Sequence, residues 1–402
     1  MNRYVRYSIY EDILFMKQTL LSALIVTLVL LSSACGGRSK TSSVNGAASD
    51  TLVFKYAENI TVVRHAEYIE VALRNPWDTL KTLHTYYLVN KHQPTPDHLS
   101  EGTLVPIPLE KSLVYSSVHC SLLNDLQTLK TVAGVCDRSY IRIPAIQKGC
   151  NNGTIIDCGS SLNPNIERII DFAPDAILLS PFENSGGYGR IEKLDIPIIE
   201  CADYMETSPL GRAEWMRFFG MLTGKEQVAD SLFAEIEKEY VSLKQQAARC
   251  SNNKTADSPV NRPSVITEMK MGSAWYVPGG KSTVARLLQD AGANYLFADN
   301  TSSGSVPLSF ETVFDKGQHA DFWLIKYNQQ TDKKYAEIAA DYAPYQHFDA
   351  WKEQRIYGCN TSKVNFYEES PFHPERLLKD LIKIFHPELL PDYETVYYSP
   401  LK

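Results

Sequence analysis

The sequence predicts an α/β protein with two lobes, each with a mostly parallel sheet flanked by helices, joined by one long rigid interlobe helix. Three observations predict this fold class. Short apolar runs alternate with helical periodicity from residue 111 onward, which is typical of βα units. A helical stretch without proline, at 225–248, separates two such regions. A pair of related segments also occurs on both sides of that stretch.

Composition and charge narrow the class of protein. Hydrophobic residues make up 44% and charged residues 22%, which is a globular composition with enough apolar content for about two to three domains. The 40 basic and 47 acidic residues give a net charge of −7. No basic stripe that could neutralise phosphates is visible, so the sequence predicts no nucleic-acid partner.

The N-terminal region, 1–35, has the features of an export signal. Its apolar core, Leu20–Leu31, carries no charge and is shorter than the roughly 20 residues that span a membrane. Small residues then precede Cys35, an arrangement that resembles the bacterial lipoprotein box, in which the signal is removed and the cysteine carries lipid. An ordinary secretory signal is the alternative. Two acidic residues upstream favour Met16 as the true start, and 36–50 reads as a flexible tether.

The N-terminal lobe is expected over 51–208. Its first part, 51–110, contains short strands broken by proline turns and looks like an addition to the lobe. The expected strands there are 60–63, 68–73 and 86–89. From 111 onward, strands are expected at 113–116, 155–158, 176–180 and 196–201, with helices around 120–130, 164–173 and 187–194.

A helical segment at 209–249 links this lobe to the next. Its long interlobe helix runs from Lys225 to about Ala248, with apolar residues spaced at three to four along one face. The polar, proline-containing stretch that follows marks the start of the C-terminal lobe, 250–402. Strands are expected there at 264–268, 295–297, 322–327 and 355–357, with helices at 281–291 and 309–316 and a final helix that starts after Pro374 and runs to about Phe385.

The related segments on either side of the long helix share one pattern. Residues 163–179 and 307–325 each combine a short amphipathic helix, a glutamate near its start and an aspartate at the head of an apolar strand. The second copy carries a two-residue insertion. This repeat favours two homologous lobes, although βα units in general look alike.

Taken in order, several runs resemble the periplasmic substrate-binding proteins of ABC importers for ferric siderophores, haem and cobalamin, in their lipoprotein form. The resemblance covers about residues 111–388. The runs are NPNIERIIDFAPDAILLSP, GYGRIEKLDIPIIEC, WYVPGGKSTVARLLQDAGANYLFAD and FHPERLLKDLIKIFHPEL, together with the lipoprotein start and the interlobe helix.

The resemblance implies a protein without enzymatic activity that captures a metal chelate and delivers it to an ABC permease dimer in the inner membrane. It implies a monomer anchored on the periplasmic side through lipid on Cys35, with no intrinsic cofactor and no resident metal. Glu167 and Glu311 match the family positions that dock onto arginines of the permease. Carboxylates near helix N-termini also complement the helix dipole, which is the plainer interpretation of both residues.

Ligand contacts are expected from loops at the carboxyl ends of strands, facing a crevice between the lobes. Aromatic side chains offer flat contact area for a corrin, a porphyrin or a catecholate, and Arg190 could pair with an anionic chelate. The expected ligand-binding residues are Ser117, His119, Tyr188, Arg190, Trp275, Tyr276, Tyr327 and Asn365.

Other functions stay open at this stage. A zinc- or manganese-type binding protein would also have a rigid helix between two lobes, and a surface hydrolase could use His119, Asp137 and Ser117. The GGKS run is not a P-loop, because Trp275 stands where the first glycine belongs. Seven cysteines besides Cys35 leave both disulfides and buried free thiols open. The loops do not match one chelate, so the cargo is not fixed.

Overall fold

The computed structural model describes residues 50–183, 187–252 and 262–402. Within these ranges no helix combines the length and apolar character needed to cross a membrane. The expected signal core Leu20–Leu31, Cys35, Met16 and the tether at 36–50 lie outside the described residues, apart from the last position of the tether.

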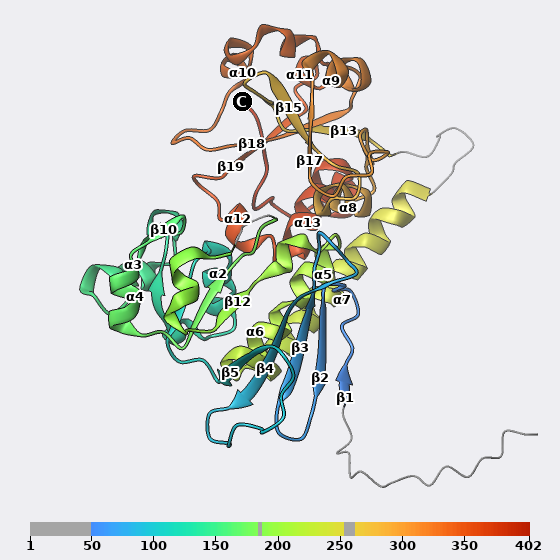
Figure 1. The fold of residues 1–402 in the computed structure, drawn as a ribbon. Helices are drawn as coiled ribbons and strands as arrows, with labels where there is room; N and C mark the ends of the chain where they lie inside the picture. Colours follow the sequence, from blue (N-terminus) through green and yellow to red (C-terminus); the bar gives the residue numbers. More distant parts are fainter. Residues whose placement is uncertain (1–49, 184–186, 253–261) are drawn as a thin grey trace, which may run out of the picture. The chain divides into compact units, whose positions relative to one another are not determined.

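The first sheet is formed by the segment that the sequence marks as an addition. It has five strands in chain order, antiparallel except for the parallel pair β4 and β5 (Figure 1). The strands are β1 (Asp50–Leu52), β2 (Ile60–Arg64), β3 (Ile69–Arg74), β4 (Thr82–Asn90) and β5 (Thr103–Ile107). The three strands expected here are confirmed. Burial alternates along β2 and β3, whereas Tyr86–Val89 of β4 are all buried.

Two buried carboxylates hold residues 55–59, just before β2, against the central helices. Glu214 accepts the backbone N–H groups of Lys55, Tyr56 and Ala57 at 2.7–2.9 Å. Glu206 accepts those of Glu58 and Asn59 at 2.9–3.1 Å. Charge-assisted hydrogen bonds of this kind are the stronger ones in proteins, so the added sheet is firmly attached.

The N-terminal lobe has a parallel five-stranded sheet in the order β12-β11-β6-β7-β8. Four of its strands fall in the expected regions, whereas β7 and the helix α3 were not predicted. The strands are β6 (Ser112–Val114), β7 (Val132–Val135), β8 (Ile156–Asp157), β11 (Ala176–Leu179) and β12 (Ile198–Glu200). The flanking helices are α2 (Ser117–Asp125), α3 (Pro144–Asn152) and α4 (Ile166–Phe172), followed by the 3-10 helix η3 (Gly189–Leu194).

The helical segment consists of α5 (Pro209–Glu214), α6 (Met216–Thr223) and the long α7 (Glu226–Asn252), as Figure 1 shows. The expected interlobe helix is confirmed. Gly224 ends α6 with a φ of +67°, a left-handed conformation that favours glycine, and α7 begins two residues later. The face of α7 that includes Ile236, Tyr240 and Leu243 is buried, as the periodicity predicts.

The C-terminal lobe has a second five-stranded sheet, in the order β16-β13-β18-β19-β20, and a separate three-stranded one. Only the edge strand β20 runs antiparallel in the larger sheet. Its strands are β13 (Ser264–Thr267), β16 (Asn294–Tyr295), β18 (Phe322–Tyr327), β19 (Ile356–Asn360) and β20 (Ser399–Pro400). The smaller sheet contains β14 (Lys270–Met271), β15 (Ala274–Pro278) and β17 (Ser305–Leu308). The helices are α8 (Thr283–Asp290), α9 (Phe310–Gly317), α10 (Tyr335–Asp341), α11 (Asp349–Lys352), α12 (Phe366–Glu369) and α13 (Pro374–Phe385).

The two lobes share one strand order. In each sheet the first strand in sequence, β6 or β13, lies between the second, β7 or β16, and the strand of the repeat, β11 or β18. The next strand, β12 or β19, lies beyond the repeat strand. The edge strands β8, next to β7, and β20, next to β19, are additions that differ between the lobes. The helix and strand of the sequence repeat, α4–β11 and α9–β18, occupy matching places. The internal repeat therefore corresponds to a topological repeat.

The cysteines and the GGKS run have structural explanations. All seven cysteines of the described ranges are free thiols, and five of them are buried. At Gly280 a Cβ atom would lie 2.2 Å from the carbonyl oxygen of Ala298 and 2.3 Å from that of Asn300. Glycine is needed there because two backbone segments approach closely, which is unrelated to phosphate binding.

Candidate functional site

A cavity of about 690 Å³ lies in the N-terminal lobe. It lies at the carboxyl ends of β6, β7 and β11, the edge at which open parallel sheets bind ligands. Its lining comprises Tyr115, Ser116, Ser117, Asp137, Tyr140, Ser161, Leu162, Asn163, Pro164, Ile166, Leu179, Ser180, Phe182, Gly187, Tyr188, Gly189, Arg190 and Ile191.

The start of α2 forms one side of the cavity. Ser116 caps this helix by accepting the backbone N–H of Val118 with its hydroxyl. The cap fixes the turn between β6 and α2, so Tyr115, Ser116 and Ser117 are held where the strand ends. The first residues of a helix present backbone N–H groups, which suits polar groups of a ligand.

A second side is a small hairpin held by Asp137, which follows β7. One oxygen of its carboxylate accepts the backbone N–H of Ser161 at 3.1 Å, and the other accepts the Ser161 hydroxyl. Asp137 has a φ of +49°, a left-handed conformation that is uncommon for a residue other than glycine. This geometry fixes the hairpin β9 (Gly159–Ser160) and β10 (Asn163–Pro164), whose tip exposes Leu162.

A third side is the loop that carries Tyr188. The Tyr188 hydroxyl donates a hydrogen bond of 2.5 Å to the buried carboxylate of Glu200, whose other oxygen lies 3.3 Å from Nδ1 of His84. His84 also pairs with Thr103 at 2.7 Å, so the added N-terminal sheet supports this side of the cavity. Burial and the neighbouring carboxylate raise the pKa of Tyr188 well above its ordinary range, so the phenol stays neutral.

Four aromatic residues and few charged ones line the cavity. Tyr115, Tyr140, Phe182 and Tyr188 line it, and the rings of Tyr140 and Phe182 are 70% and 58% exposed. Arg190 is the one cation and Asp137 the one carboxylate among the lining residues that the structure describes. Flat apolar surface with a few fixed polar groups is typical of a small-molecule site, and a volume of this size is within the usual range.

A smaller hollow of about 220 Å³ lies between residues of the two lobes. Ser117 lines both this hollow and the main cavity. From the C-terminal lobe it includes Asn365, Glu368, Glu369 and Arg376.

Two contacts connect the lobes next to this smaller hollow. Arg142 donates hydrogen bonds to the carbonyl oxygens of Thr361 and Val364. His373, just before α13, pairs with Asp125 at the end of α2 at 3.2 Å. The candidate site therefore consists of the cavity in the N-terminal lobe together with these polar contacts to the C-terminal lobe.

Four of the eight expected ligand-binding residues line these hollows: Ser117, Tyr188 and Arg190 line the cavity, and Asn365 lines the hollow between the lobes. His119 does not line either of them and needs a correction. It is buried in α2, with Nε2 2.9 Å from Asp203 and its ring stacked on Phe219. Burial alone would raise the pKa of Asp203, but His119 and Arg212 hold it below the ordinary value. His119 thus connects α2 to the helical segment.

The other three expected residues of the C-terminal lobe are also placed elsewhere. Trp275 is fully buried in β15, where it stacks on Trp323 at 5.5 Å, because the alternation of the strand directs it into the core. Its neighbour Tyr276 is exposed but lines neither hollow. Tyr327, at the end of β18, accepts the backbone N–H of Lys333 with its hydroxyl.

Glu167 and Glu311 occupy matching positions in the two lobes. Both are exposed in the first turn of a helix, α4 or α9, and that helix precedes the repeat strand of its lobe, β11 or β18. Asn165 and Ser309 cap these helices by accepting the N–H groups of Arg168 and Thr312. A backbone N–H and the Ser309 hydroxyl lower the pKa of Glu311, which keeps it charged.

Sequence reasoning missed the aromatic residues that give the cavity its character, Tyr115, Tyr140 and Phe182. Tyr115 could have been found, because it lies near the end of the strand expected at 113–116, two residues before Ser117. Phe182 lies in the glycine-rich loop that was expected to contact ligand. Tyr140 follows the unpredicted strand β7, so no recognised strand end pointed to it.

The family described as periplasmic binding protein matches this chain over residues 119–362, more than half of its length. The chain therefore belongs to that family, which confirms the resemblance seen in the sequence. The matched region begins after the added sheet, so this sheet lies outside the part that defines the family. Proteins of this family bind a small-molecule ligand and deliver it to an ABC permease, and they are binding proteins rather than enzymes.

Relatives and solved structures agree with this assignment. An uncharacterized lipoprotein of Methanocaldococcus jannaschii is 26% identical over 372 residues, which cover 87% of this chain and 85% of the relative. A periplasmic heme binding protein from Pseudomonas aeruginosa has a TM-score of 0.55 at 14% identity, covering 73% of this chain and 98% of that one. A possible iron-binding, periplasmic solute-binding protein from Staphylococcus epidermidis has a TM-score of 0.53 at 16% identity, covering 70% and 100%. These likenesses confirm the two-lobed fold.

Proposed function

We propose that this chain is a lipid-anchored receptor that captures a metal chelate in the N-terminal lobe and delivers it to an ABC importer. The observation that carries the proposal is the cavity of about 690 Å³ lined by Tyr115, Tyr140, Phe182 and Tyr188. The names of the similar proteins from Pseudomonas aeruginosa and Staphylococcus epidermidis, heme-binding and possibly iron-binding, support cargo of this kind.

The charges of the cavity favour a chelate of small net charge. Arg190 and Asp137 balance one another, and the hydrogen bonds of Asp137 to Ser161 already satisfy its carboxylate. A ferric complex with several negative charges would need more cations than these residues offer. A cobalamin, a neutral ferric hydroxamate or a porphyrin whose carboxylates reach Arg190 fits better.

The donor set of the cavity does not favour the alternative of a bare zinc or manganese ion. Such ions need several histidine, cysteine or carboxylate ligands that converge on one point. Of the described residues that line the cavity, Asp137 alone offers such a donor, and it is already hydrogen-bonded.

Delivery in this proposal uses Glu167 and Glu311. Each is an exposed carboxylate on a matching helix of its own lobe, so the two form a repeated feature that suits a permease dimer with cations. The lipid on Cys35 would keep the loaded protein close to that permease.

The proposal is tested by titrating the purified protein with cobalamin, haem, a ferric hydroxamate and a ferric catecholate. Since Trp275 is buried in the other lobe, it cannot report on the cavity, and a Phe182→Trp variant provides the reporter. We expect one near-neutral chelate to change its fluorescence saturably, with unchanged fluorescence in a Tyr276→Trp control. Binding of free zinc in the cavity, with no chelate bound, would overturn the proposal.

A further inference from the structure

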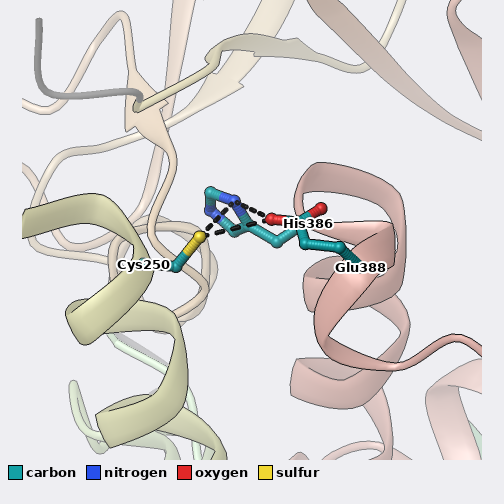
Figure 2. A group of neighbouring side chains, drawn as sticks. All are labelled: Cys250, His386 and Glu388. Carbon is teal, nitrogen blue, oxygen red and sulfur yellow. Dashed lines mark hydrogen bonds and ion pairs between the residues drawn. The ribbon is translucent and has the colours of Figure 1, made fainter. Parts of the chain in front are cut away.

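Three potential metal ligands converge at a place remote from the cavity, where α7 ends beside the end of α13. They are Cys250 in the last turn of α7, His386 directly after α13, and Glu388 two residues further on (Figure 2). Their donor atoms all lie within 4.8 Å of one another, and they form the one such group among the described residues. None of the three lines the cavity or the hollow between the lobes.

We propose that these three side chains bind a divalent transition-metal ion of the zinc class. Sγ of Cys250 lies 3.8 Å from Nδ1 of His386 and 3.2 Å from Oε1 of Glu388, and the latter two atoms are 3.9 Å apart. Zinc bonds of about 2.0 Å to nitrogen or oxygen and about 2.3 Å to sulfur separate tetrahedral ligands by roughly 3.3–3.6 Å. A zinc ion therefore fits between the three atoms with shifts of a few tenths of an ångström.

The local sequence places two of the ligands. The ring of His386 is buried, and its backbone N–H closes the last turn of α13 by donating to Ile382 at 2.7 Å. Pro387 follows and starts the 3-10 turn Pro387–Leu389, which returns Glu388 toward the histidine. A proline between the two ligands restricts the backbone, so less conformational entropy is lost when both bind one ion.

The kind of ion follows from the donors. A thiolate and an imidazole favour zinc and similar ions, whereas calcium and magnesium require oxygen ligands. In the absence of metal the Cys250 thiol donates a hydrogen bond to Glu388. Binding forms the sulfur–metal bond and releases the thiol proton to solvent. Because the Glu388 side chain is 61% exposed, a fourth position remains accessible to water.

An ion bound by these side chains would link the C-terminal end of α7 to the chain that follows α13 in the C-terminal lobe. A hydrogen bond from Lys379 in α13 to Glu239 in α7, at 2.6 Å, also links these helices. Cys250 lies two residues before the end of α7 at Asn252. A metal here would fix where α7 ends without touching the cargo cavity.

The test uses the purified full chain titrated with Zn²⁺ against a chromogenic chelator, and with Co²⁺ as a spectroscopic substitute. We expect one equivalent to bind, with the thiolate-to-cobalt charge-transfer absorption of a tetrahedral site. Cys250→Ser should abolish this absorption, and Glu388→Gln should weaken zinc binding by at least about tenfold. Zinc should also raise the midpoint of thermal unfolding in the wild type and not in Cys250→Ser.

Matched variants separate this site from other donors. Cys150→Ser removes another half-buried thiol, and Glu394→Gln removes another exposed glutamate near the C-terminus, so both should bind zinc like the wild type. Equal zinc affinity in the wild type and Cys250→Ser, or cobalt bound without thiolate absorption, would overturn the inference. These readouts concern the metal alone, so their failure is distinguishable from a failure of chelate binding in the cavity.

Discussion

Asp175 and Asp321 perform the same structural task in the two lobes. Each stands directly before the repeat strand of its lobe, β11 or β18, and binds the chain where the first strand, β6 or β13, begins. Asp175 accepts the backbone N–H of Lys111 at 3.2 Å and that of Glu110 at 2.6 Å. Asp321 accepts the backbone N–H of Ser264 at 2.7 Å and its hydroxyl at 2.6 Å. The repeated aspartate of the sequence thus joins two neighbouring parallel strands in both lobes.

Removing either aspartate should destabilise its lobe. We expect Asp175→Ala and Asp321→Ala each to lower the free energy of unfolding by roughly 1–2 kcal/mol, because backbone N–H groups lose charged acceptors. Urea unfolding followed by circular dichroism measures this. The controls are Asp171→Ala and Asp315→Ala, exposed positions on the preceding helices, and effects as large in these controls would contradict the interpretation.

His373 should make the stability of the protein depend on pH. Burial disfavours its charge, but Asp125 and Glu375 overcome this effect and raise the pKa of His373 to about 9. Since the folded pKa exceeds the unfolded value of about 6.5, the stabilisation is fully present below pH 6.5 and is lost as pH rises through 9. We expect a loss of about 2–3 kcal/mol across this window. In His373→Gln this part of the pH dependence should vanish, and a profile identical to that of the wild type would contradict the assignment.

Glu200 should affect cargo binding through Tyr188. Because the carboxylate holds the Tyr188 hydroxyl at 2.5 Å, Glu200→Ala should weaken chelate binding by about tenfold, a loss of roughly 1.4 kcal/mol. The sharp test is a double-mutant cycle. In a Tyr188→Phe background, Glu200→Ala should have little further effect on affinity, whereas additive losses would show that Glu200 acts by another route.

Charge reversal at the proposed docking glutamates should separate binding from transport. We expect the double variant Glu167→Lys and Glu311→Lys to bind chelate with wild-type affinity while cellular uptake is abolished, because like charges would face the cations of the permease. Uptake of radiolabelled chelate measures this. Glu235→Lys, at an exposed position of α7, is the control. Normal uptake by the double variant would refute the docking role.

Much of the fold is predictable from the sequence where the buried residues of an element form a continuous apolar run or recur at the period of a helix or strand. The strand expected at 322–327 coincides with β18, because its apolar run 322–325 lies between neighbouring strands on both sides. The helix expected to start after Pro374 and to run to about Phe385 matches α13, which begins one residue earlier, at Pro374, and has one strongly apolar face. By contrast, β7 was missed because Gly134 interrupts its apolar pattern. A Cβ atom there would lie 2.6 Å from the ring of Phe172, so packing requires this glycine.

The candidate ligand site was predictable only in part. The direction in which a side chain points depends on how the strands pair, and the sequence does not show this pairing. Ser117, Tyr188 and Arg190 were expected to contact ligand because they lie in loops after strands of the N-terminal lobe, and all three line the cavity. Trp275 and Tyr276 are adjacent, and the pairing of β15 with β17 decides that Trp275 enters the core. In the proposed metal site, His386 and Glu388 lie 136 and 138 positions after Cys250 in the sequence. No short sequence motif reveals ligands that are so far apart.

Calorimetric titration of matched tyrosine variants tests the central claim, that the N-terminal lobe binds the chelate, most directly. Tyr140 lines the cavity and is 70% exposed, whereas Tyr276 is 42% exposed and lies outside it. With the chelate that the wild type binds, Tyr140→Ala should lose about 10- to 100-fold in affinity, because an aromatic contact is removed. Tyr276→Ala should bind like the wild type. Unchanged affinity in Tyr140→Ala, or an equal loss in both variants, would contradict the account.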